Sequence, residues 1–368
     1  MYGCDAGTCV PIAVPDAGVQ KTWVSSGGTQ SCAVKTGGTL WCWGANDEGQ
    51  LGNGSTAAST TPVALQGNSW AQVSAGSAHS CALKRDGSLW CWGANAEHQT
   101  SSLSATVLRA PEQVPGSWKW VSAGYKYTLA ITSGGKLWAW GLNTSGELGT
   151  GNTNNVLSPV QVGTANWAMV FAGAKNSCGI QSDGSLWCWG NNDTGQLGVG
   201  STSSSTQPVL TSSASWLSVT VGGAHSCGTK SDNTLWCWGG NEYGQLGVGA
   251  VGGSDRLAPV QVPGTAWKQV FAGNYHTCAV KTGGSLWCWG EYANGQLGHG
   301  GCGTEMTSDC AEPTQVSGST WDRIDFYSDN VCGSKADGSA WCWGENNFGQ
   351  SGNGTTHIVT VPYRVLAP

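Results

Sequence analysis

Short apolar segments alternate with polar, glycine-rich stretches along almost the whole chain, and the same order of segments returns many times. One turn of this pattern reads SPVQV, WAMVFAG, SCGIQ and SLWCWG, all within residues 158–190. Each segment has the length of a β-strand and is bounded by turn residues. The pattern therefore predicts an all-β chain with four short strands per unit.

A phrase ending in Trp-x-Trp-Gly marks the units and occurs seven times, at intervals of 48 to 54 residues. Its first tryptophans are Trp41, Trp90, Trp138, Trp187, Trp236, Trp287 and Trp341. A near-constant period of this size indicates one supersecondary unit stacked on itself, and four strands per unit form a propeller blade. We therefore predict a seven-bladed β-propeller of four-stranded antiparallel blades over residues 21–368, with an arm or linker at residues 1–20.

The two ends of the repeat array each hold part of a unit. The segment KTWVSSGG reads as a second strand without a first, and VPYRVLAP reads as a first strand without a second. Each end supplies what the other lacks. We expect the last blade to be closed by strands from both termini, with Pro362–Val365 joined to Trp23–Ser25.

Two cysteines stand ten residues apart in six of the seven units. In HSCALKRDGSLWCWG a three-residue loop makes Cys81 face Cys91 across a hairpin, on a rung close enough for a disulfide. The third unit has Leu129 and Ala139 instead, so both partners are lost together, as a bond predicts. Eight disulfides are predicted: Cys4–Cys9, Cys32–Cys42, Cys81–Cys91, Cys178–Cys188, Cys227–Cys237, Cys278–Cys288, Cys302–Cys310 and Cys332–Cys342.

A metal site is the alternative for so many cysteines, but no C-x-x-C knuckle with a fixed histidine partner occurs. Paired cysteines in this number indicate an oxidising compartment. We expect a secreted or cell-surface protein, although no export signal follows Met1.

Charge and motifs exclude several function classes. Only 10% of the residues are charged and the formal charge is −6, which offers phosphates no basic surface, so no nucleic-acid partner is expected. No apolar run approaches the roughly 18 residues of a membrane span, so no membrane insertion is expected. His79, His225 and His276 share their position in the unit with Gln30 and Tyr127, which favours loop fixing over a metal ring. No catalytic constellation is present, so we expect no enzyme, cofactor or metal.

Two recurring motifs resemble a known family. Trp-Gly-x-Asn-x-x-Gly-Gln-Leu-Gly ends most units, and Ala-Gly-x-x-His-Ser/Thr recurs within them. Over residues 21–368 the units resemble the repeats of the regulator of chromosome condensation. The resemblance implies a seven-bladed propeller in a family that includes a nucleotide exchange factor, a secreted bacterial beta-lactamase inhibitor and a plant UV-B photoreceptor. The Gly-Trp-Arg-His-Thr loops of the photoreceptor are matched here by stretches such as GYKYT, which lack both Trp and Arg.

The candidate site comes from departures from the repeat. Recurring tryptophans indicate packing between blades, whereas Trp23 and Trp120 fall outside the register. Units two, three and six are irregular, and unit three also lost its cysteines. A partner-binding site is therefore predicted at His98, Trp120, Tyr125, Lys126 and Tyr127.

The expected function is an exported, non-enzymatic scaffold that presents loops to an extracellular protein, as an inhibitor or adhesion component would. Carbohydrate binding is the first alternative, because exposed Trp and Tyr with Asn and Asp nearby would also serve a glycan. An enzyme with an unrecognised site is the second.

Overall fold

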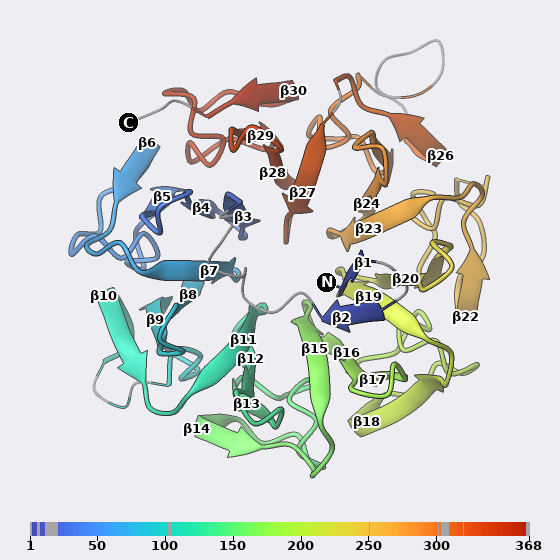
Figure 1. Ribbon diagram of the computed structural model, residues 1–368, viewed down its shortest axis with the longest axis horizontal. Helices are drawn as coiled ribbons and strands as arrows, with labels where there is room; N and C mark the ends of the chain where they lie inside the picture. The colour runs from blue at the N-terminus through green and yellow to red at the C-terminus, as the bar shows by residue number, and fades with distance from the viewer. Residues whose placement is uncertain are drawn as a thin grey trace.

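The computed structural model describes residues 21–101, 103, 105–249, 251–300, 302, 309–318 and 320–365, and the backbone of residues 2–5 and 8–11. Within these residues the chain is all-β, and seven four-stranded antiparallel sheets stand radially around one axis (Figure 1). The predicted seven-bladed β-propeller is confirmed.

The strands have the following bounds. Blade 1 contains β3 (Trp23–Ser26), β4 (Gln30–Val34), β5 (Leu40–Gly44) and β6 (Ser59–Ala64), and blade 2 contains β7 (Trp70–Ala75), β8 (His79–Lys84), β9 (Leu89–Ala94) and β10 (Val107–Val114). Blade 3 contains β11 (Trp118–Ala123), β12 (Tyr127–Thr132), β13 (Leu137–Gly141) and β14 (Val156–Gln161), and blade 4 contains β15 (Trp167–Ala172), β16 (Asn176–Gln181), β17 (Leu186–Gly190) and β18 (Ser205–Ser212). Blade 5 contains β19 (Trp216–Val221), β20 (His225–Lys230), β21 (Leu235–Gly239) and β22 (Arg256–Gln261), and blade 6 contains β23 (Trp267–Ala272), β24 (His276–Lys281), β25 (Leu286–Gly290) and β26 (Cys310–Gln315). Blade 7 contains β27 (Trp321–Asp325), β28 (Asn330–Lys335), β29 (Ala340–Gly344) and β30 (Val359–Arg364), and a separate hairpin consists of β1 (Tyr2–Asp5) and β2 (Thr8–Pro11).

Chain order and strand order agree within every blade. The first strand of each blade lies nearest the axis and the fourth forms the rim (Figure 1). Segments such as SPVQV are therefore the outermost strands of the preceding blade: in blade 3, β14 pairs with β13 through Ala139 and Val160.

The expectation that the last blade is closed by strands from both termini is wrong. Strand β30 pairs with β29 of its own blade, and β3 pairs with β4. The prediction grouped each rim strand with the blade that follows it in the sequence. In the structure the chain returns through a long loop, and the rim strand pairs with the blade that precedes it. Both end blades are complete, so the related expectation that the C-terminal strand joins Trp23–Ser25 also fails.

Side-chain contacts between blades 7 and 1 close the ring instead. The Arg323 guanidinium stacks 3.7 Å from the ring centroid of Trp23, and the Trp43 indole donates to the carbonyl of Gln350 at 2.7 Å. At the surface, Lys21 Nζ lies 2.8 Å from Asp322 Oδ1. Closure therefore uses the same blade-to-blade packing as the other six interfaces.

Tryptophans form the repeating core of the blades. In blade 4, Trp167 at the start of the inner strand packs edge-to-face on Trp189 at 5.6 Å, and equivalent pairs recur in other blades. The Trp189 indole also donates to the carbonyl of residue 147 in the preceding blade at 2.8 Å. The prediction that recurring tryptophans pack blade against blade is confirmed.

Seven of the predicted disulfides lie among the described side chains, and all seven are present. Six staple the second and third strands of a blade with Cα atoms 4.1 Å apart, and Cys302–Cys310 is the seventh. In blade 3, Leu129 and Ala139 face each other at the same position of the register. Cys4 and Cys9 are opposite each other in the β1–β2 hairpin, but their side chains lie outside the described residues. Seven disulfides fit an oxidising environment.

Candidate partner-binding face and axial pocket

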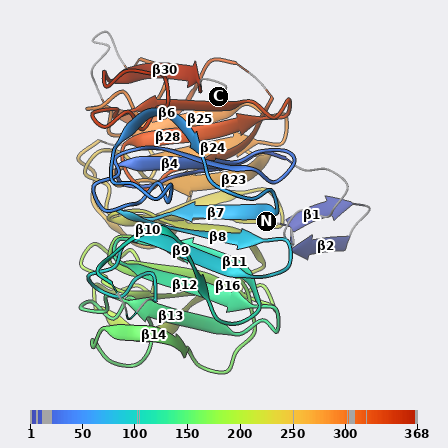
Figure 2. The ribbon, with the colours of Figure 1, turned by 90° about the vertical axis from the view of Figure 1, so that its left-hand side faces the viewer.

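The antiparallel blades give the ring two different faces. The connections from first to second strand and from third to fourth strand meet on one side, here called the loop face. The tight turns between second and third strands and the links between blades meet on the opposite side, here called the hairpin face. Figure 2 views the ring from its edge, so that the two faces lie to the left and right.

Charge is divided unevenly between the faces. The described loops of the loop face contain two lysines, Lys126 and Lys175, and eleven carboxylates. These are Asp47, Glu48, Glu97, Glu147, Asp193, Glu242, Asp255, Glu291, Asp309, Asp329 and Glu345. On the hairpin face, five blades place a lysine ammonium over a tryptophan ring, as Lys230 does 3.8 Å from the centroid of Trp236. The loop face therefore has a negative potential relative to the hairpin face.

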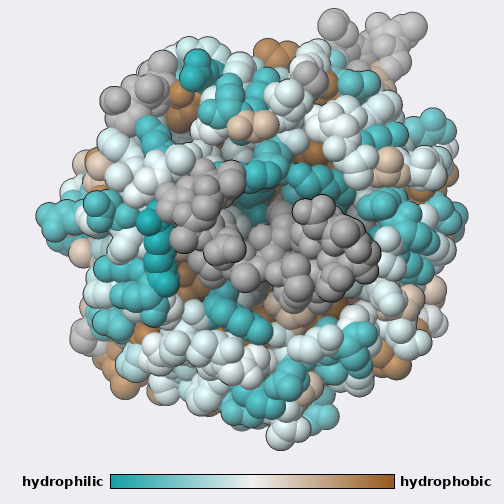
Figure 3. Space-filling model, in the orientation of Figure 1, coloured by the Kyte–Doolittle hydropathy of each residue, from teal (hydrophilic) through white to brown (hydrophobic). Residues whose placement is uncertain are grey.

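Hydrophobic side chains are dispersed on the visible surface. In the orientation of Figure 1, hydrophilic residues dominate the space-filling view, and the apolar ones form small separate patches (Figure 3). Among the described residues, exposed large apolar side chains in loops of the loop face are the aromatic Tyr125, Tyr275 and Phe348 and the aliphatic Leu103, Val251 and Ile358.

Polar side chains hold the long loops of the loop face in shape. In blade 3, Asn143 Oδ1 accepts from the backbone N–H of Leu148 at 3.0 Å, and its amide donates to the carbonyls of residues 152 and 154. The consensus glycines have positive φ, as Gly49 does at 73°. In unit two His98 takes that position with φ 62°. His98 is partly buried and borders an open hollow with Leu103.

Two of the five predicted binding residues are buried. Trp120 is only 8% exposed, and its indole donates to the carbonyl of Val170 at 2.8 Å. Tyr127 is fully buried, and its hydroxyl donates to the carbonyl of Asn176 at 2.8 Å. Their burial supports a packing role. Trp23 has the same environment as Trp120, since its indole donates to the next blade at 2.9 Å.

The other predicted residues reach the surface. Tyr125 is 40% exposed, and the Lys126 ammonium lies 5.5 Å from the centroid of its ring. The structure thus brings Tyr125 and Lys126 together on the loop face and separates them from Trp120. Their role in binding stays a prediction, as does that of His98.

The recurring histidines join neighbouring blades. His79 Nε2 lies 3.0 Å from Thr128 Oγ1, and His225 Nε2 lies 2.8 Å from Thr277 Oγ1. Burial lowers the pKa of each to about 3, so both are neutral. In blade 7 the hydroxyl-bearing position is Val331, and His276 Nε2 has no partner among the described residues.

Restoring that hydroxyl gives a direct test of the blade-to-blade bond. We expect Val331→Thr to raise the free energy of unfolding by about 1 kcal/mol, because a buried hydroxyl then pairs with His276 Nε2. Urea denaturation measures the change. Val331→Ser is the matched control, since it adds the same hydroxyl and removes a methyl group. A threonine variant less stable than the wild type would contradict this interpretation of the histidine position.

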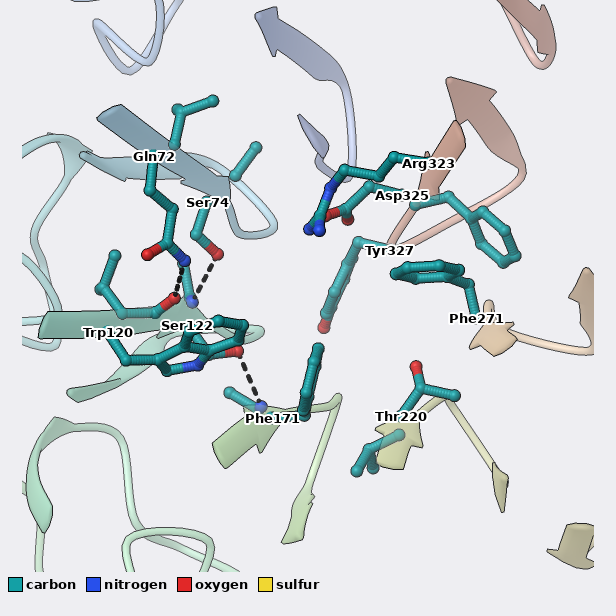
Figure 4. A pocket seen from close by; sticks show the side chains of 17 residues that line it. Gln72, Ser74, Trp120, Ser122, Phe171, Thr220, Phe271, Arg323, Asp325 and Tyr327 are labelled. Carbon is teal, nitrogen blue, oxygen red and sulfur yellow. Dashed lines mark hydrogen bonds and ion pairs between the residues drawn. The ribbon is translucent and has the colours of Figure 1, made fainter. Parts of the chain in front are cut away.

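An axial pocket lies where the inner strands reach the loop face. A cavity of about 50 Å³ is lined by inner-strand residues of blades 2 to 7 and by the two residues that follow β27, and Figure 4 shows Tyr327, Phe171, Phe271, Arg323 and Asp325 around it. Arg323 Nη2 pairs with Asp325 Oδ2 at 2.8 Å. Burial raises the pKa of Asp325 to about 6, although Arg323 opposes the shift.

Blade 7 departs from the repeat at this pocket. Most blades continue the inner strand into Ala-Gly, and a Cβ on Gly76 would lie 2.5 Å from the carbonyl oxygen of Gly124. Blade 7 has Phe326 and Tyr327 there, and the buried Tyr327 hydroxyl has no partner among the described residues. In the sequence this departure is visible as the segment RIDFY, residues 323–327, which is not among the predicted site residues.

A second cluster of side chains lies on the loop face of blades 5 to 7. Tyr243 and Tyr275 are in ring contact at 4.9 Å. Burial and the nearby charges of Asp329 and Asp309 raise the pKa of Glu291 to about 7. These carboxylates lack a counter-charge, since no lysine or arginine forms an ion pair with them among the described residues.

One group has metal-ligand spacing, namely His299, Cys302 and Cys310. The two sulfurs are bonded to each other, so they are not available as thiolate ligands. In the described part of the chain no helix is long and apolar enough to span a membrane.

Comparisons with known proteins agree with the repeat pattern. The model of the RCC1-like domain matches residues 3–335, and that of the regulator of chromosome condensation (RCC1) repeat matches residues 321–350. The chain is 34% identical over 99 residues to the X-linked retinitis pigmentosa GTPase regulator homolog of Caenorhabditis elegans, which covers 25% of this chain and 7% of that protein. It is 31% identical over 118 residues to the ultraviolet-B receptor UVR8 of Arabidopsis thaliana, which covers 31% of this chain and 26% of that protein. The matches therefore span only a small part of these curated relatives.

Solved structures share the fold at low identity. Yeast RCC1 (Prp20), in a complex with Kap60, gives a TM-score of 0.81 at 19% identity over 95% of this chain and 84% of that chain. Human WBSCR16 gives a TM-score of 0.80 at 18% identity over 90% of this chain and 94% of that chain. Because the domain model spans nearly the whole chain and the architecture agrees with it, this protein belongs to the RCC1-like domain family.

Proposed function

We propose that this protein is an exported, non-enzymatic scaffold whose loop face binds a basic segment of an extracellular protein. The observation that carries the proposal is the division of charge, with eleven carboxylates and two lysines in the described loops of that face. Such a surface attracts a basic partner and repels an acidic one. The uncompensated carboxylates beside Glu291 add to this preference.

Exposed aromatic side chains give the face its anchors. Tyr275 is 39% exposed and Phe348 is 43% exposed, in addition to Tyr125 in blade 3. Tyrosine and other aromatic residues are enriched among the few residues that dominate binding energy at interfaces. The surrounding loops are held by side-chain hydrogen bonds, so little ordering entropy is lost on binding.

The remaining parts of the proposal rest on chemistry and on the fold. Disulfides in this number persist in oxidising compartments, which supports export. Prp20p from Saccharomyces cerevisiae, of the same fold at 20% identity, has been studied for its binding to Gsp1p and histones. That relative supports protein docking by this architecture, while the partner proposed here is defined only by its charge.

The test compares two triple variants against an extracellular partner identified by cross-linking. Replacing Tyr125, Tyr275 and Phe348 by alanine should weaken binding by more than about 30-fold, since one good anchor contributes about 2 kcal/mol. The matched control replaces the rim residues Leu157, Leu210 and Val361 by alanine, three apolar side chains of similar exposure. The control should bind like the wild type.

Two further readouts separate the alternatives. Binding should weaken as salt increases, because the attraction is between opposite charges. Equal losses in the two variants, or binding that strengthens with salt, would contradict the proposal. Selective capture of glycans by the wild type, lost in the loop-face variant, would favour the carbohydrate-binding alternative.

A further inference from the structure

The axial pocket has the size and polarity of a small binding site. Its volume of about 50 Å³ exceeds the roughly 10 to 15 Å³ that a single water requires, so it has room for a carboxyl-sized group. Phe171, Phe271 and Tyr327 form apolar walls, and the Arg323–Asp325 pair lies beside them (Figure 4).

Hydrogen-bond donors line this pocket in excess. Ser74 Oγ and Ser122 Oγ each accept from a backbone N–H of the next blade at 3.0 Å, which leaves each hydroxyl proton available to donate. Thr220 Oγ1 accepts in the same way at 3.2 Å. The buried Tyr327 hydroxyl and Arg323 Nε have no partner among the described residues.

Acceptors are scarce by comparison. Besides the hydroxyls, the side-chain acceptors that line the cavity are the Gln72 amide oxygen and the Asp325 carboxylate, whose Oδ2 Arg323 Nη2 already holds at 2.8 Å. We infer that the axial pocket is a binding site for a carboxylate, held by Arg323 and the Tyr327 hydroxyl with the serine and threonine hydroxyls around it. Charge-assisted hydrogen bonds of this kind are the strong ones.

The carboxylates of the loop face do not prevent this, because all but Asp329 lie in the loops between third and fourth strands rather than in the loops next to the axis. They are on the loop face at the surface, where salt screens charges beyond about 8 Å at physiological ionic strength. Inside the pocket the short-range donors and the arginine decide which group binds. The carboxylates of the loop face slow the entry of an anion, but the donors and the arginine that bind it inside the pocket remain.

Asp325 competes with a bound carboxylate for Arg323. The groups that act on Asp325 are Arg323 on its own strand and Ser25 on β3. Asp322, with Lys21 and Lys268, forms a separate ion-pair cluster toward the hairpin face. A bound carboxylate adds negative charge beside Asp325 and raises its pKa above 6, so binding takes up a proton. Affinity should therefore rise as the pH falls toward 6 and level off below it.

The chain offers a clean probe, because it contains five arginines, Arg85, Arg109, Arg256, Arg323 and Arg364. Acetate is titrated into protein carrying ¹⁵N-labelled arginine, and the five Nε–H signals are followed by NMR. Acetate should shift the Arg323 signal selectively and more strongly at pH 5.5 than at pH 7.5. Acetamide, which has the same shape without the charge, should not shift it.

Two variants sharpen the test. At pH 7, Asp325→Asn should bind acetate about tenfold more tightly and without pH dependence, because about a tenth of a group with pKa about 6 is protonated there. Tyr327→Phe should bind about tenfold more weakly with unchanged thermal stability, since it removes one donor that has no partner in the described structure. No selective shift at Arg323, an equal shift with acetamide, or tighter binding at higher pH would overturn the inference.

A separate competition experiment distinguishes two sources of the carboxylate, a side chain of the protein partner and a small free acid. If it belongs to an Asp or Glu side chain of the partner, acetate should compete with that partner and Tyr327→Phe should weaken the complex. If it belongs to a small free acid, acetate should bind with no effect on the partner. Failure of the loop-face variants, by contrast, bears only on the proposed scaffold function.

Discussion

Replacing Arg323 by methionine should lower the free energy of unfolding at pH 7 by about 3 kcal/mol, because it leaves a largely buried carboxylate, 22% exposed, without its counter-charge. Asp325 pairs with Arg323 Nη2 at 2.8 Å, and Arg323 also stacks on Trp23 across the interface that closes the ring. Urea denaturation at several pH values measures the effect. The loss should be smaller at pH 5, where Asp325 is protonated and no longer needs the arginine.

Asp325→Asn is the matched control and should not destabilise the protein at pH 7. The folded-state pKa of Asp325 is about 6, above its ordinary value of 3.8, so the folded state holds the proton more tightly than the unfolded state. The contribution of this group to stability is therefore highest at low pH and falls as the pH rises from about 4 through 6. Asparagine avoids that loss, which is at most about 3 kcal/mol. Equal destabilisation by the two substitutions would show that the pair, rather than the arginine, stabilises the interface.

The repeat pattern contained most of the architecture. Period, strand count, the hairpin pairing of Cys81 with Cys91 and the absence of a bond at Leu129 and Ala139 all follow from local spacing. The frame of the blades does not, because a rim segment such as Val156–Gln161 lies between two Trp-x-Trp-Gly phrases and is compatible with either neighbour. Along the chain this segment lies nearer to β15 than to β13, although it pairs with β13.

A polar network in the longer loop decides that frame. Asn143 accepts from Leu148 N–H and donates to the carbonyls of residues 152 and 154, which folds the loop back so that β14 pairs with β13. Hydrogen bonds of this kind depend on loop conformation, which strand periodicity does not report. Blades 7 and 1 then close the ring through side-chain packing, as between Arg323 and Trp23, without sharing a strand.

The sequence predicted only part of the candidate site. Trp120 and Tyr127 departed from the repeat for packing reasons, since each bonds the next blade from a buried position. The binding site is instead indicated by blade 7, where four residues differ from the repeat at once and line the axial pocket. These are Arg323, Asp325, Phe326 and Tyr327. Distinguishing these cases requires knowing which repeat positions point at the axis, and that depends on how seven separate strands converge.

The hairpin disulfides give the last prediction, in which unit three supplies the replacement residues. Converting Cys81 to leucine and Cys91 to alanine copies the Leu129–Ala139 pair into blade 2, where both positions are fully buried. We expect the double variant to lose about 2 to 3 kcal/mol of stability, the loop entropy that a crosslink of this length removes from the unfolded chain.

The control is the double serine variant at the same positions, which should lose more than the leucine and alanine variant because two hydroxyls are buried at a cost of about 1 to 3 kcal/mol each. Reductant should lower the stability of the wild type and narrow its advantage over both variants. Denaturation with and without reductant measures all three proteins. If the leucine and alanine variant matches the oxidised wild type, the bond adds nothing to stability in a blade whose neighbour folds without one, and the six recurring staples need another explanation.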